Sequence, residues 1–340
     1  MFQLPALLLA SLPLTVLAGN AHEGSLRHRH EQHARALHSR QSKTYALVDD
    51  YNGKSFLNES QWNYFTDSDP THGLVTYQSK NDAAAADLAY VQPDNVFILA
   101  VDNKTQLSSG QNRKSTRISS VKTYDSGLFI ADFWAMPAGC SVWPAWWTVG
   151  PDWPLNGEID IIEGVNNMGT NQYTGHGSAG CTLSADAIEK PVKLFTGNLV
   201  NTACQSNATS NAGCAFTDTD NRSFGTNFNN AGGGIFAHLV DQDGIKVWHF
   251  ARSEIPQDIE DGKPDPTKWG NPVANIPASG CNPAEHIKKH VLVINTTLCG
   301  DWAGGSFSSM GCPGTCPDFV ADPKNFDNAR WAIRSIKVYA

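Results

Sequence analysis

The sequence predicts an all-β protein whose strands form a sandwich of two sheets. Short apolar runs bounded by Gly, Asn, Asp or Pro recur along the 340 residues, a pattern typical of antiparallel strands joined by turns. No long stretch shows the period of an amphipathic helix, and no linker rich in Pro, Gly or Ser divides the chain. The candidate strands, in chain order, are residues 96–101, 127–133, 234–240, 246–250, 291–295 and 333–339.

The first 43 residues differ in composition from the rest of the chain. Residues 1–18 form a leucine-rich run that ends in a small residue, as signal peptides do, and Pro5 and Pro13 interrupt it too often for a membrane span. Residues 19–43 hold five His and four Arg without apolar periodicity, which favours a disordered spacer or pro-segment over a metal-binding tract. We therefore expect a signal peptide over 1–18, a pro-segment or spacer over 19–43, and a single domain over 44–340.

Cysteine and sequon usage indicate a secretory route. All eight Cys lie within residues 44–340, and an even number is typical of disulfides in extracellular proteins. The C-terminal residues carry no hydrophobic tail of the kind that anchors a chain to lipid. We expect a secreted, extracellular monomer that does not bind membranes. Asn-x-Ser/Thr sequons, which agree with this route, occur at Asn58, Asn103, Asn207, Asn221 and Asn295.

The segment 201–234 is predicted to be one long surface loop. It is dominated by Asn, Thr, Ser and Gly and contains two of the sequons. Cys204 and Cys214 bracket a short polar stretch of it in which no strand-forming residues hold the chain. We therefore expect a disulfide between these two residues, which would close a loop of about ten residues.

The formal net charge argues against several classes of partner. Residues 1–43 contain five basic and two acidic residues, so a chain whose total charge is −8 carries −11 on residues 44–340. A surface of this sign repels nucleic acids and anionic polymers. We expect no nucleic acid partner, and a neutral substrate suits the domain better.

The most informative segment is residues 158–163, which read Glu-Ile-Asp-Ile-Ile-Glu. Ile favours the extended conformation, and Gly157 and Gly164 bound the segment, so it is predicted to be a strand. Hydrolysis of a glycosidic bond typically uses two carboxyl groups, one that attacks the sugar and one that protonates the leaving oxygen. Glu158 and Glu163 are such a pair, and the shorter Asp160 lies between them. Taken alone, the hexad also fits a solvated acidic strand or a calcium site.

The spacing of these acids predicts an irregularity in the strand. Side chains alternate between the two faces, so Glu158 and Asp160 share a face, whereas an offset of five residues places Glu163 on the other. One β-bulge absorbs the extra Ile and returns Glu163 to the face of the other two acids. Long Glu side chains on a bent strand can then approach the ~5 to 5.5 Å separation of a retaining pair.

A cluster of Trp immediately upstream of the hexad indicates a sugar-binding surface. Indole faces stack on the apolar C–H faces of sugar rings. Trp146 and Trp147 are adjacent, so on a strand at most one of them lines a cleft and the other belongs to the core. His176 follows the hexad by one turn-rich segment and could return to the same cleft. The five Trp of this cluster are Trp134, Trp143, Trp146, Trp147 and Trp153.

Three motifs combine the Trp cluster, the hexad and a segment near the C-terminus. They read Trp143-Pro-Ala-Trp-Trp147, Asp152-Trp-Pro-Leu-Asn-Gly-Glu-Ile-Asp-Ile-Ile-Glu-Gly-Val-Asn166 and Cys299-Gly-Asp-Trp-Ala-Gly304. With Asp-Pro-Thr-His-Gly at 69–73 and the eight Cys, they resemble the secreted fungal members of glycoside hydrolase family 16, the laminarinase-like endo-1,3(4)-β-glucanases. The resemblance extends from roughly Tyr45 to Ala340.

The resemblance implies a concanavalin A-like β-jelly-roll sandwich with an open substrate cleft. It also implies hydrolysis of β-1,3- or mixed β-1,3/1,4-glucan with retention of configuration through a covalent glycosyl-enzyme. By position, Glu158 matches the nucleophile, Asp160 the assisting acid and Glu163 the general acid/base. The remaining matches are the sugar-stacking Trp143, Trp153 and Trp302, a cleft histidine, His176, and a cleft arginine, Arg117.

Two other functions stay open at this point, and neither they nor the hydrolase are expected to need a cofactor or a metal. A wall-remodelling transglycosylase shares the nucleophile and differs only in whether water or a sugar intercepts the intermediate. A glucan-binding lectin can use the same sandwich, because one fold serves many functions. A lectin, however, has no need for three acids on one bulged strand.

Overall fold

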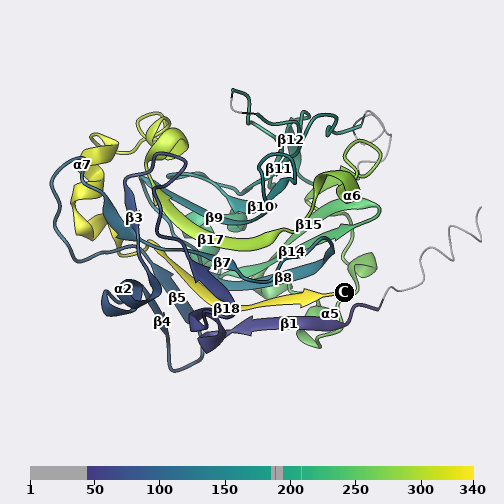
Figure 1. Ribbon diagram of the computed structural model, residues 1–340, viewed down its shortest axis with the longest axis horizontal. Helices are drawn as coiled ribbons and strands as arrows, with labels where there is room; N and C mark the ends of the chain where they lie inside the picture. The colour runs from purple at the N-terminus through teal and green to yellow at the C-terminus, as the bar shows by residue number, and fades with distance from the viewer. Residues whose placement is uncertain (1–43, 185–187, 189–193, 208) are drawn as a thin grey trace, which may run out of the picture. The chain divides into compact units, whose positions relative to one another are not determined.

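Two eight-stranded antiparallel sheets pack against each other in the computed structural model (Figure 1), and they confirm the predicted all-β jelly-roll sandwich. The structure describes residues 44–184, 188, 194–207 and 209–340. The expected signal peptide, 1–18, and pro-segment, 19–43, lie outside the described residues. A small parallel pair, β3 (Val75–Tyr77) with β6 (Arg113–Ser115), completes the strands of the described part.

The first sheet has the order β16-β15-β14-β8-β18-β5-β4, and β1 pairs with β18 beside this path. It contains five of the six candidate strands, four of them over their whole predicted length and the fifth, 96–101, in part. The sequence marked these strands as short apolar runs between turn residues. Its strands are β1 (Leu47–Asn52), β4 (Ala89–Val91), β5 (Phe97–Ala100), β8 (Gly127–Ala135), β14 (Gly234–Asp241), β15 (Gly244–Ala251), β16 (Ala274–Pro277) and β18 (Arg330–Tyr339).

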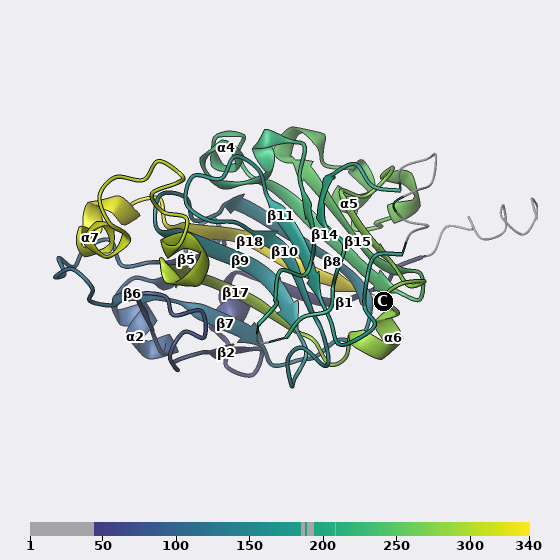
Figure 2. The same cartoon turned by 90° about the horizontal axis from the view of Figure 1, so that it is seen from above.

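The second sheet has the order β12-β13-β11-β10-β9-β17-β7-β2. It is the upper layer in Figure 1, and Figure 2 looks onto it from above. Its strands are β2 (Trp62–Tyr64), β7 (Arg117–Ser120), β9 (Val142–Val149), β10 (Glu158–Glu163), β11 (Gln172–His176), β12 (Asn198–Asn201), β13 (Cys214–Thr217) and β17 (Val291–Leu298).

Helices are short throughout the described residues and serve as connections. The α-helices are α2 (Lys80–Ala85), α4 (Gly225–Asn230), α5 (Gln257–Glu260), α6 (Pro283–His286) and α7 (Cys316–Ala321). The remaining helical turns are η1 (Gly53–Leu57), η2 (Asn221–Ser223), η3 (Arg252–Glu254), η4 (Pro266–Lys268), η5 (Gly300–Gly304) and η6 (Pro323–Phe326). Over the part of the chain that the structure describes, none of the helices has the length and apolar character needed to span a bilayer.

The core between the sheets follows from the two-residue period of the strands. On β9, Trp146 is fully buried and meets Phe133 of β8 edge to face, with 6.3 Å between the ring centroids. Phe133 in turn packs on Trp331 of β18. The Ile residues of the acidic strand, Ile159 and Ile161, point into the same core. Burial of these apolar side chains fixes which face of the second sheet remains for substrate.

The prediction of one long loop over 201–234 was wrong in its second half. The segment contains β13, which pairs with both β11 and β12, and also α4. The four residues of β13, Cys-Ala-Phe-Thr, are too few to give a clear period, so the sheet pairing decides their conformation. The predicted disulfide between Cys204 and Cys214 is confirmed.

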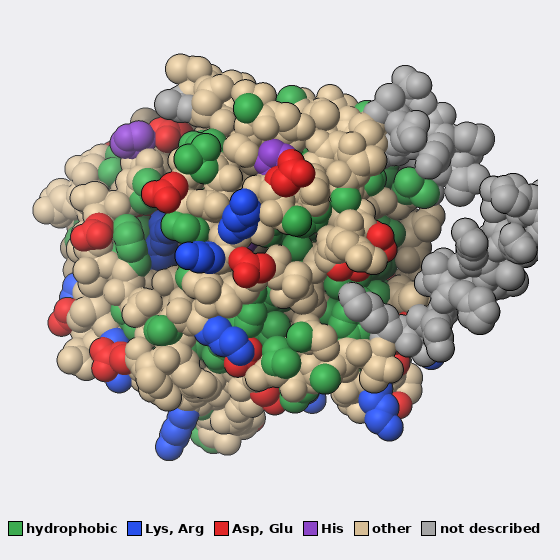
Figure 3. Space-filling view, turned by 45° about the vertical axis from the view of Figure 1, so that its right-hand side comes forward, with side chains coloured by type: hydrophobic (Ala, Val, Ile, Leu, Met, Phe, Trp, Pro, Cys, Tyr) green, Lys and Arg blue, Asp and Glu red, His purple; other side chains and the backbone are tan. Residues whose placement is uncertain are grey.

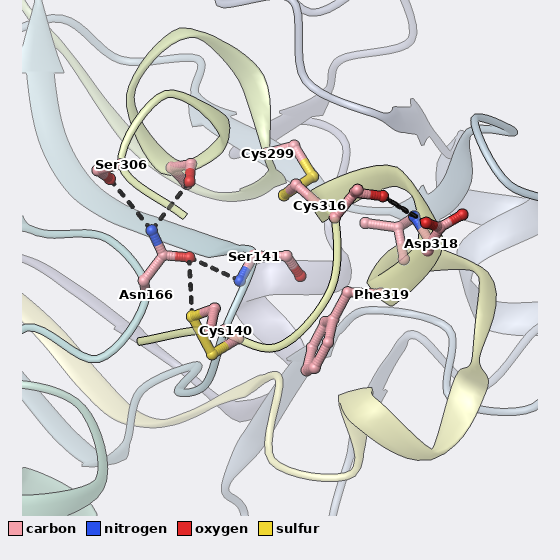
Figure 4. The surroundings of a disulfide bond; sticks show 12 residues. Cys140, Ser141, Asn166, Cys299, Ser306, Cys316, Asp318 and Phe319 are labelled. Atoms are coloured by element: carbon pink, nitrogen blue, oxygen red, sulfur yellow. Dashed lines mark hydrogen bonds between the residues drawn. A yellow bond between two sulfur atoms is a disulfide. The ribbon is translucent and has the colours of Figure 1, made fainter. Parts of the chain in front are cut away.

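The eight cysteines form four disulfides. Cys140–Cys312 ties the segment after β17 to the residues before β9, and Cys299–Cys316 joins the end of β17 to the start of α7. Figure 4 shows Asn166 beside them: its Oδ1 accepts from the Ser141 backbone N–H, and its Nδ2 donates to the Ala303 carbonyl. These bonds fix the η5 segment, which carries Trp302. The remaining bridge is Cys181–Cys281, whose two residues are 100 positions apart in the sequence.

Candidate active site

A cavity of about 800 Å³ lies on the outward face of the second sheet. It is lined by every residue that the sequence proposed for the site: Arg117, Trp143, Trp153, Glu158, Asp160, Glu163, His176 and Trp302. Strands β7, β9, β10 and β11 contribute most of them, and the turn before β10 and the η5 segment contribute Trp153 and Trp302. The two-residue period explains this convergence, since alternate side chains of neighbouring strands project to the same side of the sheet.

The acidic strand carries the expected bulge. Against β9, Asp160 pairs with Trp147 and Ile162 with Trp146, so two steps on β10 match one step on β9. The pairing with β11 is shifted at the same place, between Asp160 and Glu163. Ile161 and Ile162 are both fully buried in the core, whereas Glu158, Asp160 and Glu163 all line the cavity. The bulge thus places the three acids on one face.

His176 of β11 lies beside the acids of β10. Its register partner is Glu158, and its Nε2 lies 3.2 Å from Oδ2 of Asp160. Its Nδ1 lies 2.9 Å from the hydroxyl of Ser206, which belongs to the segment closed by the Cys204–Cys214 disulfide. The Ser206 hydroxyl donates to the Cys204 carbonyl and therefore accepts from Nδ1–H.

Burial governs the charge state of the three carboxyl groups. Burial, with the charge of Asp160 next, raises the pKa of Glu158 to about 8, while His176 and a hydrogen bond with Trp153 act in the opposite direction. Burial likewise raises the pKa of Asp160 to about 7. Burial and the charge of Asp160 raise the pKa of Glu163 well above its ordinary value. Like charges this close together cannot all ionise, so the cluster keeps at least one proton near neutral pH.

Glu163 has a specific aromatic partner in Trp143 of β9. The indole Nε1 donates to Oε1 of Glu163 at 3.2 Å. The same indole meets Trp302 edge to face, with the ring centroids 5.6 Å apart. Trp143 therefore joins a carboxyl group of the site to the aromatic wall formed by the η5 segment.

Trp147 and Asn295 line the cavity beside Arg117, and neither of the two was assigned to the site from the sequence. Trp147 lines the cavity, and its Nε1 donates to Oδ1 of Asn295 at 2.7 Å. The guanidinium of Arg117 lies over the rings of Phe65 and Trp147, at 4.4 and 5.0 Å from their centroids. Burial lowers the pKa of Arg117. Asn295 was noted from the sequence only as a sequon; the structure buries it and places it among the residues that line the cavity.

The remaining Trp residues of the cluster separate as strand alternation requires. Trp146 is in the core and Trp147 in the cavity, which confirms that only one of the two lines the site. Trp153 is 39% exposed at the cavity, 6.4 Å from the His176 ring between centroids. Trp134 lies elsewhere: it is on β8 of the first sheet, where the guanidinium of Arg252 covers its ring at 4.0 Å.

The Asp-Pro-Thr-His-Gly segment forms one wall of the cavity. Asp69 accepts hydrogen bonds from the Thr71 and Thr297 hydroxyls and from the Gly73 backbone N–H. His72 contacts Asp301 of the η5 segment, with Nδ1 3.0 Å from Oδ2. The segment is thereby fixed to the end of β17. The family resemblance drew attention to this segment, but its position beside the cavity became clear only from the fold.

Ligand atoms of Glu158, Asp160 and His176 lie within 4.8 Å of one another, so these residues could together hold a metal ion. On the face that Figure 3 displays, acidic and basic side chains are interspersed among uncharged ones.

Comparisons with known proteins show the family of this chain. Residues 62–339 match the family model described as the XgeA-like catalytic domain of glycoside hydrolase family 16. The chain belongs to glycoside hydrolase family 16. It is 42% identical over 322 residues to a protein of Schizosaccharomyces pombe named "Probable glycosidase", an alignment that covers 94% of this chain and 73% of that protein.

Other relatives of this family 16 chain are longer proteins. It is 40% identical over 317 residues to a protein of Neosartorya fischeri named "Probable endo-1,3(4)-beta-glucanase". That alignment covers 90% of this chain and 47% of the relative, so the chain spans about half the length of that protein.

Two solved structures of family 16 enzymes share the fold. Laminarinase 16A of Phanerochaete chrysosporium, bound to two β-glucans in its donor and acceptor sites, is 40% identical with a TM-score of 0.82. The match covers 88% of this chain and all of that chain. An elongating β-1,3-glucosyltransferase of the same family is 39% identical with a TM-score of 0.79 and covers 87% of this chain and all of its own.

Proposed function

We propose that this chain is a secreted, retaining endo-β-glucanase that hydrolyses β-1,3- or mixed β-1,3/1,4-glucans. The observation that carries the proposal is the bulge of β10, which brings three carboxyl groups to one face of a cavity lined by four Trp. Paired carboxyl groups fit glycoside hydrolysis, and indole rings fit the apolar faces of glucose units. Relatives named as endo-1,3(4)-β-glucanases support the same substrate class.

In the first step, Glu158 acts as the nucleophile and Glu163 as the acid. The Glu158 carboxylate forms a bond to the anomeric carbon as the glycosidic C–O bond breaks, and the proton of Glu163 passes to the departing oxygen. Glu163 is suited to hold this proton because burial and two neighbouring acids disfavour its anion. His176 and a hydrogen bond with Trp153 favour the anion of Glu158, and the charges of Asp160 and Glu158 oppose the anion of Glu163.

In the second step, Glu163 acts as the base. Its carboxylate takes a proton from water as the water oxygen bonds to the anomeric carbon, and Glu158 leaves as the carboxylate. Two inversions at the same carbon give net retention. Asp160, between the two Glu residues, couples their protonation through its own charge and through its contact with His176.

A transglycosylase is the second candidate, because one structural neighbour is an elongating β-1,3-glucosyltransferase. It would use the same glycosyl-enzyme and pass the sugar to another glucan instead of water. A lectin is disfavoured, since binding alone gives no reason to bury three acids together. We further propose that residues 44–340 act as the catalytic domain without a bound metal or cofactor.

Product analysis tests the proposal. The full chain is incubated with laminarin, lichenan and cellulose, and released oligosaccharides are sized over time. Shorter oligosaccharides from the first two substrates support hydrolysis, products longer than a supplied oligosaccharide support transfer, and binding without any new product supports a lectin. Proton NMR of the earliest products should show the β-anomer, and an initial α-anomer would contradict retention.

A further inference from the structure

Asn171 lies at the irregular step between β10 and β11, immediately before β11 begins. Its Oδ1 accepts from the backbone N–H of Glu163 at 3.0 Å, and its Nδ2 donates to the backbone carbonyl of Ile161 at 2.8 Å. These two groups flank Ile162, where three steps on β10 oppose two on β11. One side chain thus bonds the strand on both sides of its bulge.

We propose that Asn171 is a positioning residue that holds the bulge of β10 and so aims the carboxyl group of Glu163 into the cleft. The inference rests on the proposed function, because it assigns Asn171 a part in acid/base catalysis by Glu163. Asn171 is fully buried and is not among the residues that line the cavity, so it acts on substrate only through the strand.

Asn171 is itself held firmly, which a positioning role requires. Its backbone N–H donates to the Ser223 hydroxyl at 3.0 Å, and its carbonyl accepts from the Asp218 backbone N–H at 2.9 Å. The Ser223 hydroxyl donates onward to the Asp220 carbonyl. The backbone of Asn171 is therefore anchored by the segment around η2, and its side chain reaches β10 from this fixed position.

The two hydrogen bonds from Asn171, which we call the brace, matter because a register slip of one residue exchanges the two faces of a strand. In a regular β10, Glu163 would point into the core between the sheets and one of the buried Ile residues would face the cleft. Glu158 lies on the other side of the bulge and keeps its position in either register. Loss of the brace should therefore impair the acid/base and spare the nucleophile.

The hydrogen bonds require both halves of an amide. Asp at this position can accept from the Glu163 N–H but cannot donate to the Ile161 carbonyl, and Leu keeps the volume but can do neither. Asn171→Asp therefore removes one of the two hydrogen bonds to β10, and Asn171→Leu removes both. A displacement of about 1 Å at a catalytic group can reduce the rate 10²-fold.

Asn229 of α4 offers a matched control. Its Oδ1 accepts from the Met136 backbone N–H and its Nδ2 donates to the Met136 carbonyl, both at 2.9 Å. This is the same bonding pattern, at a residue that does not line the cavity. Asn229→Asp and Asn229→Leu report what the loss of a bridging amide does to folding alone.

The test measures two activities of wild type and of all four variants. The first is kcat/KM on laminarin, and the second is the rate at which an aryl glucoside oligomer with a good leaving group glycosylates the enzyme. The good leaving group needs little proton donation. For Asn171→Leu we expect activity on laminarin to fall about 10²-fold or more, glycosylation by the aryl substrate to fall less than about tenfold, and Asn171→Asp to lie between. The Asn229 variants should keep the wild-type ratio of the two activities.

A folded Asn171→Leu variant that keeps the wild-type ratio of the two activities would overturn the proposal and leave the glucanase function intact. Wild type that acts on neither substrate would instead overturn the proposed function. One measurement does not depend on any variant folding. In wild type, the Glu163 amide should exchange with deuterium as slowly as that of Ile159 in the regular part of β10, and rapid exchange would contradict the brace.

Discussion

The indole Nε1 of Trp143 donates a hydrogen bond to Oε1 of Glu163 at 3.2 Å, so a residue assigned to sugar stacking also contacts the proposed acid/base. This bond lowers the pKa of Glu163, against the larger effect of burial. Trp143→Phe keeps an aromatic ring and removes the donor. We expect the basic limb of the kcat/KM profile to move to higher pH and kcat to fall several-fold.

The matched control for Trp143 is Trp302→Phe, which also trims an indole of the same aromatic wall but removes no bond to Glu163. It should weaken substrate binding and leave the basic limb in place. A basic limb that is unchanged in Trp143→Phe would show that the indole bond has no part in setting the proton of Glu163.

Asp160→Asn should move both limbs of the pH profile to lower pH. The charge of Asp160 raises the pKa of both Glu158 and Glu163, so its removal favours both anions. Glu158 then becomes ionised at lower pH, and Glu163 loses its proton at lower pH. Steady-state rates from about pH 3 to 9 on laminarin would measure this, and limbs that move upward or in opposite directions would contradict the coupling.

Glu158→Gln should stabilise the fold at neutral pH. The pKa of Glu158 is about 8 in the folded protein against 4.5 in the unfolded chain, so the folded state retains a proton that the unfolded state releases. Stability is therefore lost as pH rises from about 4.5 to 8. Because Gln carries no proton to lose, the variant should gain on the order of a few kcal/mol at pH 8 and nothing at pH 4.

Thermal unfolding of wild type and Glu158→Gln at both values measures this difference. Equal melting temperatures at pH 8 would show that the site imposes no electrostatic strain at Glu158.

His238 of β14 should limit stability in acid. It is stacked on Phe129 with 4.4 Å between the ring centroids, and neither ring nitrogen has a hydrogen-bond partner among the described residues. Burial lowers its pKa from 6.5 to about 3, so the unfolded chain binds a proton that the folded protein does not. Stability present above about pH 6.5 is lost as pH falls toward 3.

His238→Phe replaces one planar ring by another and removes this proton. Relative to wild type, the variant should gain stability between pH 6.5 and 4, by on the order of a few kcal/mol at the lower end. Denaturant unfolding at pH 7 and pH 4 would measure the gain. A variant with the wild-type loss on acidification would assign that loss to other groups, such as the buried His290.

Sequence patterns predicted the structure correctly where a rule about neighbouring residues allows only one arrangement. The two-residue period placed Trp146 and Trp147 on opposite faces, and the five-residue offset of Glu158 and Glu163 required a bulge on any strand with both acids in one cleft. The Cys204–Cys214 disulfide followed from a loop too short and polar to hold itself. In each case the geometry depends on neighbours in the chain.

Structural features that depend on contacts with distant segments could not be predicted from the sequence in this way. β13 is a strand because β11 and β12 bond to it, and Trp134 belongs to the first sheet because β8 pairs with β14 and β18. Asn171 carries no motif: its importance follows only from the register shift that it spans. The pairing of remote strands decides these positions, and a single sequence contains no local record of it.

Azide rescue of the two Glu variants tests their assigned roles most directly. Glu163→Ala should lose ~10²- to 10⁴-fold activity on glucan, because its leaving group needs a proton. An aryl glucoside oligomer with a good leaving group should still form the glycosyl-enzyme, and added azide should restore turnover and release the β-glycosyl azide. Glu158→Ala has no nucleophile, so azide can only attack directly and yield the α-azide. The reverse pattern would exchange the roles of the two residues, and full activity of both variants on glucan would show that the acidic strand is not the catalytic site.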